Sequence, residues 1–192
     1  MVIDAHIHYL PQEAIDKATV SGGFDYRALL KGELSLPYKR LQDLEEILGI
    51  MEGAGVDMAV LNNASWAAQG LEVCKALNDG YARVGREYPE KFISCGHITL
   101  QPGQETVDEA ERCITELGLK GLSMVSSLPD ITPDSPELWP IYEKLSQLDV
   151  PMVVHPSVRF PLWEEARNTR CAERYPENTI LPNVLWKSFT AC

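Results

Sequence analysis

Val2-Ile3-Asp4-Ala5-His6 is a short, mainly apolar stretch of the kind that forms a β-strand, and four more such stretches follow it along the chain. They lie at residues 56–61, 92–98, 119–125 and 151–155, and each of the five is followed by a helical pattern. Strands that alternate with helices in this way indicate successive βαβ units, in which helices cover a parallel sheet. The sequence therefore predicts an α/β fold.

The intervals between these stretches show the periodicity of helices. Apolar residues recur at helical spacing over residues 41–51, 71–88, 107–117 and 138–148. Glycine or proline follows each run, as is usual where helices end. Residues 9–40 are less regular and look like an insertion after the first strand.

The pattern weakens after His155. Residues 163–174 fit a fifth helix, but residues 178–182 make at best a very short sixth strand. A chain of 192 residues has the length of one domain. We therefore expect a single domain over residues 1–192, with about five to six parallel strands and helices on the outside.

The charge balance limits the partners of this chain. It has 17 Lys and Arg against 28 Asp and Glu, a formal net charge of −11. Nucleic-acid binding depends on basic groups that neutralise phosphates, and this sequence has neither a surplus nor a run of them. Its apolar runs are also far short of the roughly 20 residues that span a bilayer. We expect a small-molecule substrate as partner, with neither nucleic acid nor membrane.

The N-terminus and the cysteines favour a cytoplasmic setting. Met1 leads directly into the first strand, without the basic and apolar regions of a secretory signal. The five cysteines form no CxxC pair and are odd in number, so they indicate neither a disulfide framework nor a cysteine zinc site.

Two histidines, His6 and His8, stand at the end of the first predicted strand. Residues i and i+2 of a strand point to the same side, so both imidazoles can converge on one ion. Neutral imidazole nitrogens suit zinc, manganese, iron or nickel. HxH pairs also occur by chance in exposed strands, so the pair alone is a weak indication of a metal site.

His155 ends the fifth predicted strand, and Pro156 then prevents the hydrogen-bond ladder from continuing. Parallel barrels place reactive groups at the C-terminal ends of their strands, which is where His6, His8 and His155 all lie. Packing explains this placement poorly, since a buried imidazole without partners costs free energy. The sequence therefore predicts that these three histidines bind one divalent metal ion.

Further segments add a family pattern to the histidines. They are Ile3-Asp4-Ala5-His6-Ile7-His8 with Leu10-Pro11, and residues 77–79, 88–92, 117–122, 136–142 and 154–157. Together they resemble the amidohydrolase-related group that contains aminocarboxymuconate-semialdehyde decarboxylase. The resemblance covers roughly residues 2–160 and is specific at the level of the superfamily.

This resemblance implies a metal-dependent (β/α)₈ TIM barrel with His6, His8 and His155 as ligands of a divalent ion, zinc first and manganese as the alternative. Family members add an aspartate after the eighth strand and a histidine after the sixth. Neither has a counterpart here, because the fourth histidine is His97 and residues 180–190 lack the expected HxGG-like segment.

The length and the missing residues lead us to expect a partial barrel, truncated after the fifth strand. A closed barrel of this class takes about 250 residues. An exposed parallel edge carries unpaired backbone groups and invites association, so a homo-oligomer or a complementing fragment is expected as partner.

Two functions stay open at this point. The first is a metal-dependent hydrolase or decarboxylase that acts on a small, carboxylated substrate. The second is a catalytically inactive fragment of such an enzyme with at most a weak three-histidine metal site. Three neutral histidines supply no carboxylate to accept a proton, so we expect little or no turnover from this chain.

Arg159 and Asn62 are the candidates for substrate binding. Arg159 can pair with a carboxylate through two parallel hydrogen bonds, although a surface arginine explains it equally well. Asn62 follows the second strand and can line the pocket, although turn formation also accounts for it. For His97, a hydrogen-bonded place in the barrel mouth is favoured over a role in the site.

Overall fold

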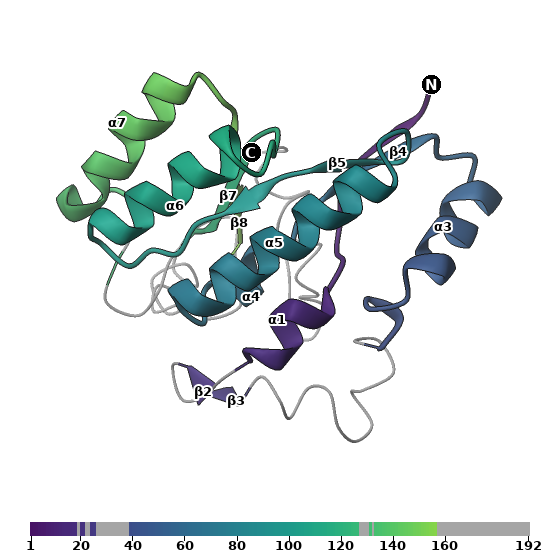
Figure 1. Ribbon diagram of the computed structural model, residues 1–192, viewed down its shortest axis with the longest axis horizontal. Helices are drawn as coiled ribbons and strands as arrows, with labels where there is room; N and C mark the ends of the chain where they lie inside the picture. Colours follow the sequence, from purple (N-terminus) through teal and green to yellow (C-terminus); the bar gives the residue numbers. More distant parts are fainter. Residues whose placement is uncertain (19, 22–23, 26–38, 127–130, 132, 157–192) are drawn as a thin grey trace, which may run out of the picture.

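A computed structural model shows how the chain folds and describes residues 1–18, 20–21, 24–25, 39–126, 131 and 133–156 (Figure 1). The helix predicted at 163–174, the short strand predicted at 178–182 and Arg159 lie outside these ranges. None of the described helices is long and apolar enough to cross a membrane.

The centre of the fold is a set of short strands that run parallel to their neighbours. They are β1 (Ile3–Ile7), β4 (Met58–Leu61), β5 (Phe92–Ser94), β6 (Gly96–His97), β7 (Leu122–Val125) and β8 (Met152–His155). The hydrogen-bonded orders are β1-β4-β5 and β6-β7-β8. Only Cys95 separates β5 from β6, so these two occupy one strand position and the series runs in chain order. The predicted parallel sheet in sequential order is confirmed.

Helices connect these strands. They are α1 (Gln12–Asp16), α3 (Leu44–Gly53), α4 (Ala64–Ala67), α5 (Leu71–Glu87), α6 (Gln104–Thr115), the 3-10 helix η2 (Pro136–Leu138) and α7 (Trp139–Leu148). In Figure 1, α5, α6 and α7 follow one another along one side of the strands. The prediction of outer helices is confirmed.

Local chemistry sets the helix ends. Asp43 caps α3, because its side chain accepts a hydrogen bond from the backbone N–H of Glu46 at 2.9 Å. Helix α5 stops one residue before Tyr88, which precedes Pro89 and is therefore disfavoured in helical conformation. Past α6, Gly118 adopts a left-handed φ of 72°, which glycine accepts without a steric penalty.

The insertion after β1 contains a feature that the sequence analysis did not predict. Strands β2 (Val20–Ser21) and β3 (Phe24–Asp25) pair in antiparallel fashion. The two intervening residues are glycines, which is a recognised hairpin pattern and could have been used to predict this pairing.

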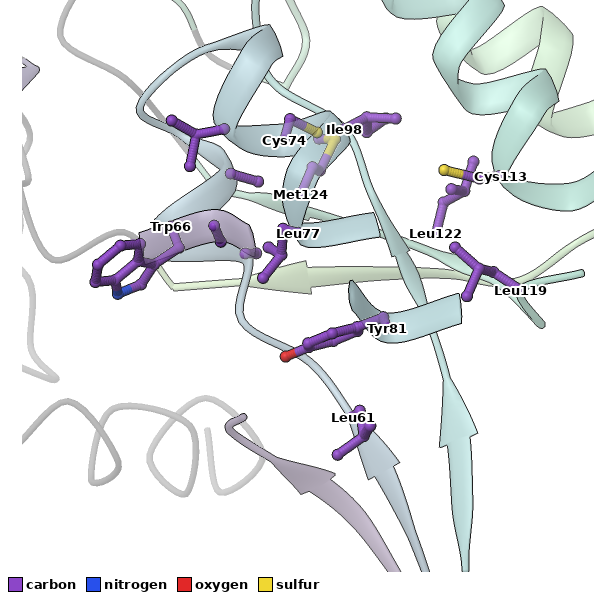
Figure 2. Packing of buried hydrophobic residues seen from close by; sticks show 14 of the residues in the cluster. Leu61, Trp66, Cys74, Leu77, Tyr81, Ile98, Cys113, Leu119, Leu122 and Met124 are labelled. Carbon is purple, nitrogen blue, oxygen red and sulfur yellow. The ribbon is translucent and has the colours of Figure 1, made fainter. Parts of the chain in front are cut away.

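The core lies between the strands and the covering helices, where buried side chains of α4, α5 and β7 meet (Figure 2). Trp66, Leu77, Tyr81 and Met124 are all 2% exposed or less. The Tyr81 hydroxyl keeps a partner there, since it donates a hydrogen bond to the Tyr9 carbonyl at 2.8 Å.

The described part of the sheet is an open arc. Within it, β1 and β8 are the outer strands, and each pairs on one side only. Apolar side chains on both remain exposed, with Ile3 at 42% and Val154 at 38%.

Candidate metal centre

The side chains of His6, His8 and His155 meet at the C-terminal ends of β1 and β8. The Nε2 atoms of His6 and His8 are 2.9 Å apart, and those of His8 and His155 are 3.3 Å apart. One nitrogen from each ring lies within 4.8 Å of the other two. The structure therefore brings together the three residues that the sequence proposed as ligands.

Curvature of the sheet makes this meeting feasible. His8 and His155 belong to opposite ends of the described arc, so their side chains can approach only across its inner face. Residues in register across parallel strands point to the same side, as Val125 and His155 do. The inner face of the arc thus carries the histidine cluster.

Protonation of His155 is fixed by its neighbour. Its Nδ1 lies 2.8 Å from the carbonyl oxygen of Pro156. A carbonyl can only accept a hydrogen bond, so Nδ1 carries the proton and Nε2 keeps its lone pair. That lone pair belongs to the nitrogen that faces His8.

Burial and mutual repulsion keep the cluster neutral. Burial, and then the nearby His155 and His6, lower the pKa of His8 to about 3. The pKa of His6 is lowered by desolvation and by His155, against the opposing effect of Asp4. Burial also lowers the pKa of His155, against the Pro156 carbonyl. Neutral imidazoles are the form in which histidine binds metal.

A divalent ion fits these nitrogens. Two nitrogens that each lie about 2.0–2.1 Å from one ion are separated by about 2.8–3.4 Å at bond angles between 90° and tetrahedral. The Nε2 separations of 2.9 Å for His6–His8 and 3.3 Å for His8–His155 lie within that range. An all-imidazole set suits zinc, whereas manganese, which prefers oxygen ligands, would bind it more weakly.

Carboxylates are absent from this cluster among the described residues. Asp4 Oδ1 accepts a hydrogen bond from the backbone N–H of His6 at 3.1 Å, so Asp4 supports the strand end.

Asn62 lies beside the cluster, immediately after β4. Its backbone N–H donates to the carbonyl of Ile7, the last residue of β1, which lies between His6 and His8, at 2.9 Å. Its side-chain Oδ1 accepts hydrogen bonds from the Ala64 N–H at 3.2 Å and from the Ser123 hydroxyl at 3.0 Å. The turn role that the sequence offered for Asn62 is therefore present, and its substrate role stays a prediction.

His97 is fully buried and hydrogen-bonded. It contacts the Asn63 backbone through Nε2 and the Asn78 side chain through Nδ1. Ser123 and the polar role of Asn78 were not predicted from the sequence. Asn78 is a polar residue on the buried, mainly apolar face of α5, and this placement was the one feature of the sequence that could have identified it.

The fold and the site define a class of protein: a parallel α/β sheet of the TIM-barrel type with histidines gathered at the C-terminal ends of its strands. The sequence profile of the amidohydrolase family matches residues 3–182, so the chain belongs to that family.

Known relatives match the chain over part of their length. It is 28% identical to 2-amino-3-carboxymuconate-6-semialdehyde decarboxylase of Dictyostelium discoideum over 80% of this chain and 48% of that protein. It is 29% identical to 2-keto-4-carboxy-3-hexenedioate hydratase of a Sphingobium species, over 82% of this chain and 52% of that protein.

A solved structure adds the likeness in three dimensions. A variant of 5-carboxyvanillate decarboxylase from Novosphingobium aromaticivorans, with bound manganese and 3-methoxy-4-hydroxy-5-nitrobenzoic acid, aligns with a TM-score of 0.70 at 25% identity. The alignment covers 88% of this chain and 56% of that one. The chain thus spans about half the length of the relatives it matches.

Proposed function

We propose that His6, His8 and His155 bind one divalent metal ion, zinc or manganese, at a site that decarboxylates a small carboxylated substrate. The observation that carries this proposal is the approach of three imidazole nitrogens from opposite ends of the strand series. When bound, the ion supplies Lewis-acid polarisation of a substrate oxygen.

The protein residues around this site act by orientation. The Pro156 carbonyl fixes the His155 tautomer, and Asp4 holds the backbone at His6. Each contact leaves an imidazole free to present a lone pair to the cluster. Groups that are placed in advance in this way need little reorganisation when a ligand binds.

The substrate class follows from the relatives. The names of the Dictyostelium and Novosphingobium proteins both describe loss of carbon dioxide from a carboxylated, unsaturated compound. The Sphingobium relative is a hydratase, and its substrate is also carboxylated. For this chain we propose that Arg159 pairs with a substrate carboxylate and that Asn62 donates a hydrogen bond to a second substrate oxygen.

One observation favours a second candidate, a chain that binds metal without turnover. The cluster contains no carboxylate among the described residues, and a proton acceptor is typically worth about 10²–10⁴-fold in rate.

The experiment loads the full chain with Mn²⁺ or Zn²⁺ and supplies, in separate assays, 5-carboxyvanillate, 2-amino-3-carboxymuconate-6-semialdehyde or the tricarboxylate 2-keto-4-carboxy-3-hexenedioate. Release of carbon dioxide that depends on metal and is lost in His155→Ala supports the decarboxylase. Metal binding without release supports the second candidate, and hydration of an unsaturated tricarboxylate would point to hydratase chemistry. Failure to bind metal would contradict both candidates.

A further inference from the structure

A layer of polar side chains lies beneath the histidine cluster. His97, Ser123 and Val153 are in register on β6, β7 and β8, so their side chains point to the same face. Val153 lies two residues before His155 on β8, and residues i and i+2 of a strand point to the same side. The shared face is therefore the one that carries the histidine cluster. His97 and Ser123 are completely buried there.

Backbone groups fix the tautomer of His97. The N–H of Asn63 lies 2.9 Å from His97 Nε2. A backbone N–H only donates, so Nε2 is the unprotonated nitrogen and the proton sits on Nδ1. Nδ1 is 3.3 Å from Asn78 Oδ1. The Asn78 atom that faces Nδ1 must be the oxygen, because it also accepts a hydrogen bond from the backbone N–H of His97 at 2.7 Å.

Asn78 is itself fixed from the opposite side. Its Nδ2 donates to the His97 carbonyl at 2.9 Å and to Glu109 Oε1 at 2.7 Å. The Glu109 side chain is 1% exposed and accepts a hydrogen bond from Arg112 Nε at 2.7 Å. A chain of hydrogen bonds, in which each group donates to the next, therefore runs from Asn63 through His97 and Asn78 to Glu109 on α6.

His97 holds the turn that carries Asn62. Because the Ala64 N–H only donates, the atom of Asn62 that faces it must be Oδ1, and the side-chain amide cannot be flipped. Ser123 contacts the same oxygen. Nδ2 is consequently a buried donor, and it has no hydrogen-bond partner among the described residues. Leaving a buried donor unpaired costs free energy and calls for an explanation.

We propose that His97 is a positioning residue. With its proton on Nδ1, the ring accepts a hydrogen bond from the backbone N–H of Asn63 through Nε2. This contact holds the side-chain amide of Asn62 where its Nδ2 can donate to a substrate oxygen. The substrate part of this inference rests on the proposed function. His97 itself touches neither metal nor substrate, because its Nε2 is already engaged by Asn63.

The tautomer is tested first, on the metal-free full chain. Long-range ¹H–¹⁵N NMR correlations of the imidazoles distinguish a protonated from an unprotonated ring nitrogen. We expect His97 to show an unprotonated Nε2 and a slowly exchanging proton on Nδ1. A proton on Nε2, or rapid averaging between the two nitrogens, would overturn the proposal.

Substitutions then test the positioning role, with 3-methoxy-4-hydroxy-5-nitrobenzoic acid as the probe and Mn²⁺ affinity as the second readout. His97→Leu removes the acceptor for the Asn63 amide, and we expect it to weaken probe binding by about tenfold. His97→Gln keeps an acceptor oxygen and should restore binding. Neither should change Mn²⁺ affinity, and Asn62→Leu should add nothing to His97→Leu.

Other outcomes decide against the proposal or against the function on which it rests. Equal weakening by His97→Gln and His97→Leu, or additive loss with Asn62→Leu, would overturn the positioning role. If the wild-type chain binds neither Mn²⁺ nor the probe, the proposed function fails. Hydrogen exchange of the Asn63 amide is then decisive: protection that is lost in His97→Leu supports the hold on the turn, and unchanged exchange contradicts it.

Discussion

Burial makes His97 resist protonation, and stability should therefore depend on pH. Desolvation, followed by repulsion from His155, His8 and His6, lowers the pKa of His97 to about 3. Between about pH 3 and pH 6.5, the unfolded chain therefore binds more protons at His97 than the folded chain does. The stabilisation is complete above pH 6.5 and is lost as the pH falls, at about 1.4 kcal/mol per pH unit.

The measurement is the free energy of unfolding of the metal-free chain between pH 5 and 7.5, with His97→Gln as the control. Carboxylates and the other histidines contribute to both proteins, so the difference in slope isolates His97. We expect a steeper loss at low pH in the wild type. Parallel curves would show that His97 titrates normally.

The identity of the three clustered histidines could be predicted at this scale, but the polar layer could not. His6, His8 and His155 each stand at a strand end, and a strand end has a known place in a parallel sheet. Ser123 sits in a short apolar strand, and nothing in its neighbours shows that its hydroxyl meets Asn62. That contact links β7 to the end of β4 and depends on the curvature of the sheet.

Helix α5 approaches α1 closely because a residue without a side chain, Gly80, lies at the contact. A Cβ on Gly80 would meet the Pro11 side chain, with its Cγ at 2.6 Å. We expect Gly80→Ala to destabilise the fold by about 1–3 kcal/mol, because overpacking outweighs the gain in helix propensity. Gly49→Ala is the matched control in α3, where nothing lies within 4 Å.

Both variants are compared by urea unfolding. Gly49→Ala should stabilise the chain by about 0.5–1 kcal/mol. The same small gain in Gly80→Ala would show that α1 and α5 are not in close contact.

Helix α6 contains two glutamates with opposite surroundings. The buried Glu109 accepts hydrogen bonds from Asn78 and Arg112, whereas Glu111 pairs with Lys144 at the surface. Glu109→Gln places an N–H₂ where an acceptor is needed and should cost about 1–3 kcal/mol of unfolding free energy.

The same change at Glu111 is the control and should stay within about 0.5 kcal/mol, since exposed ion pairs contribute little. Thermal and urea unfolding of Glu109→Gln and Glu111→Gln measure the difference. Equal effects would show that Glu109 is not the anchor of the Asn78 contact.

Helices with a clear hydrophobic periodicity could be predicted from the sequence, whereas elements too short to show a full period could not. The apolar face of α5 continues over 17 residues, which is long enough to define a helix. Helix α4 has only four residues, and β2 and β3 have two each, so none contains a full period. Tertiary contacts, more than local pattern, decide whether such elements form.

At the scale of the molecule, the fold class was predictable because right-handed βαβ units leave few topologies open. The strand-end histidines predicted that the ends of β1 and β8 approach each other, but how far the arc curves could not be read from the sequence. Family relatives are about twice as long as this chain. Association with a second copy or with a complementing fragment stays a prediction, consistent with the exposed apolar residues on β1 and β8.

The proposed function depends most on three histidines that share one metal ion. The direct measurement titrates the metal-free full chain with Mn²⁺ and follows free Mn²⁺ by electron paramagnetic resonance. We predict that one ion binds per chain and that binding is about 100-fold or more weaker in His155→Ala, since even loss of an outer contact to a ligand typically costs about 10–100-fold. His97→Gln, which alters a buried histidine outside the cluster, should bind like the wild type. Equal affinity in the wild type and His155→Ala, or the same loss in His97→Gln, would contradict the three-histidine site.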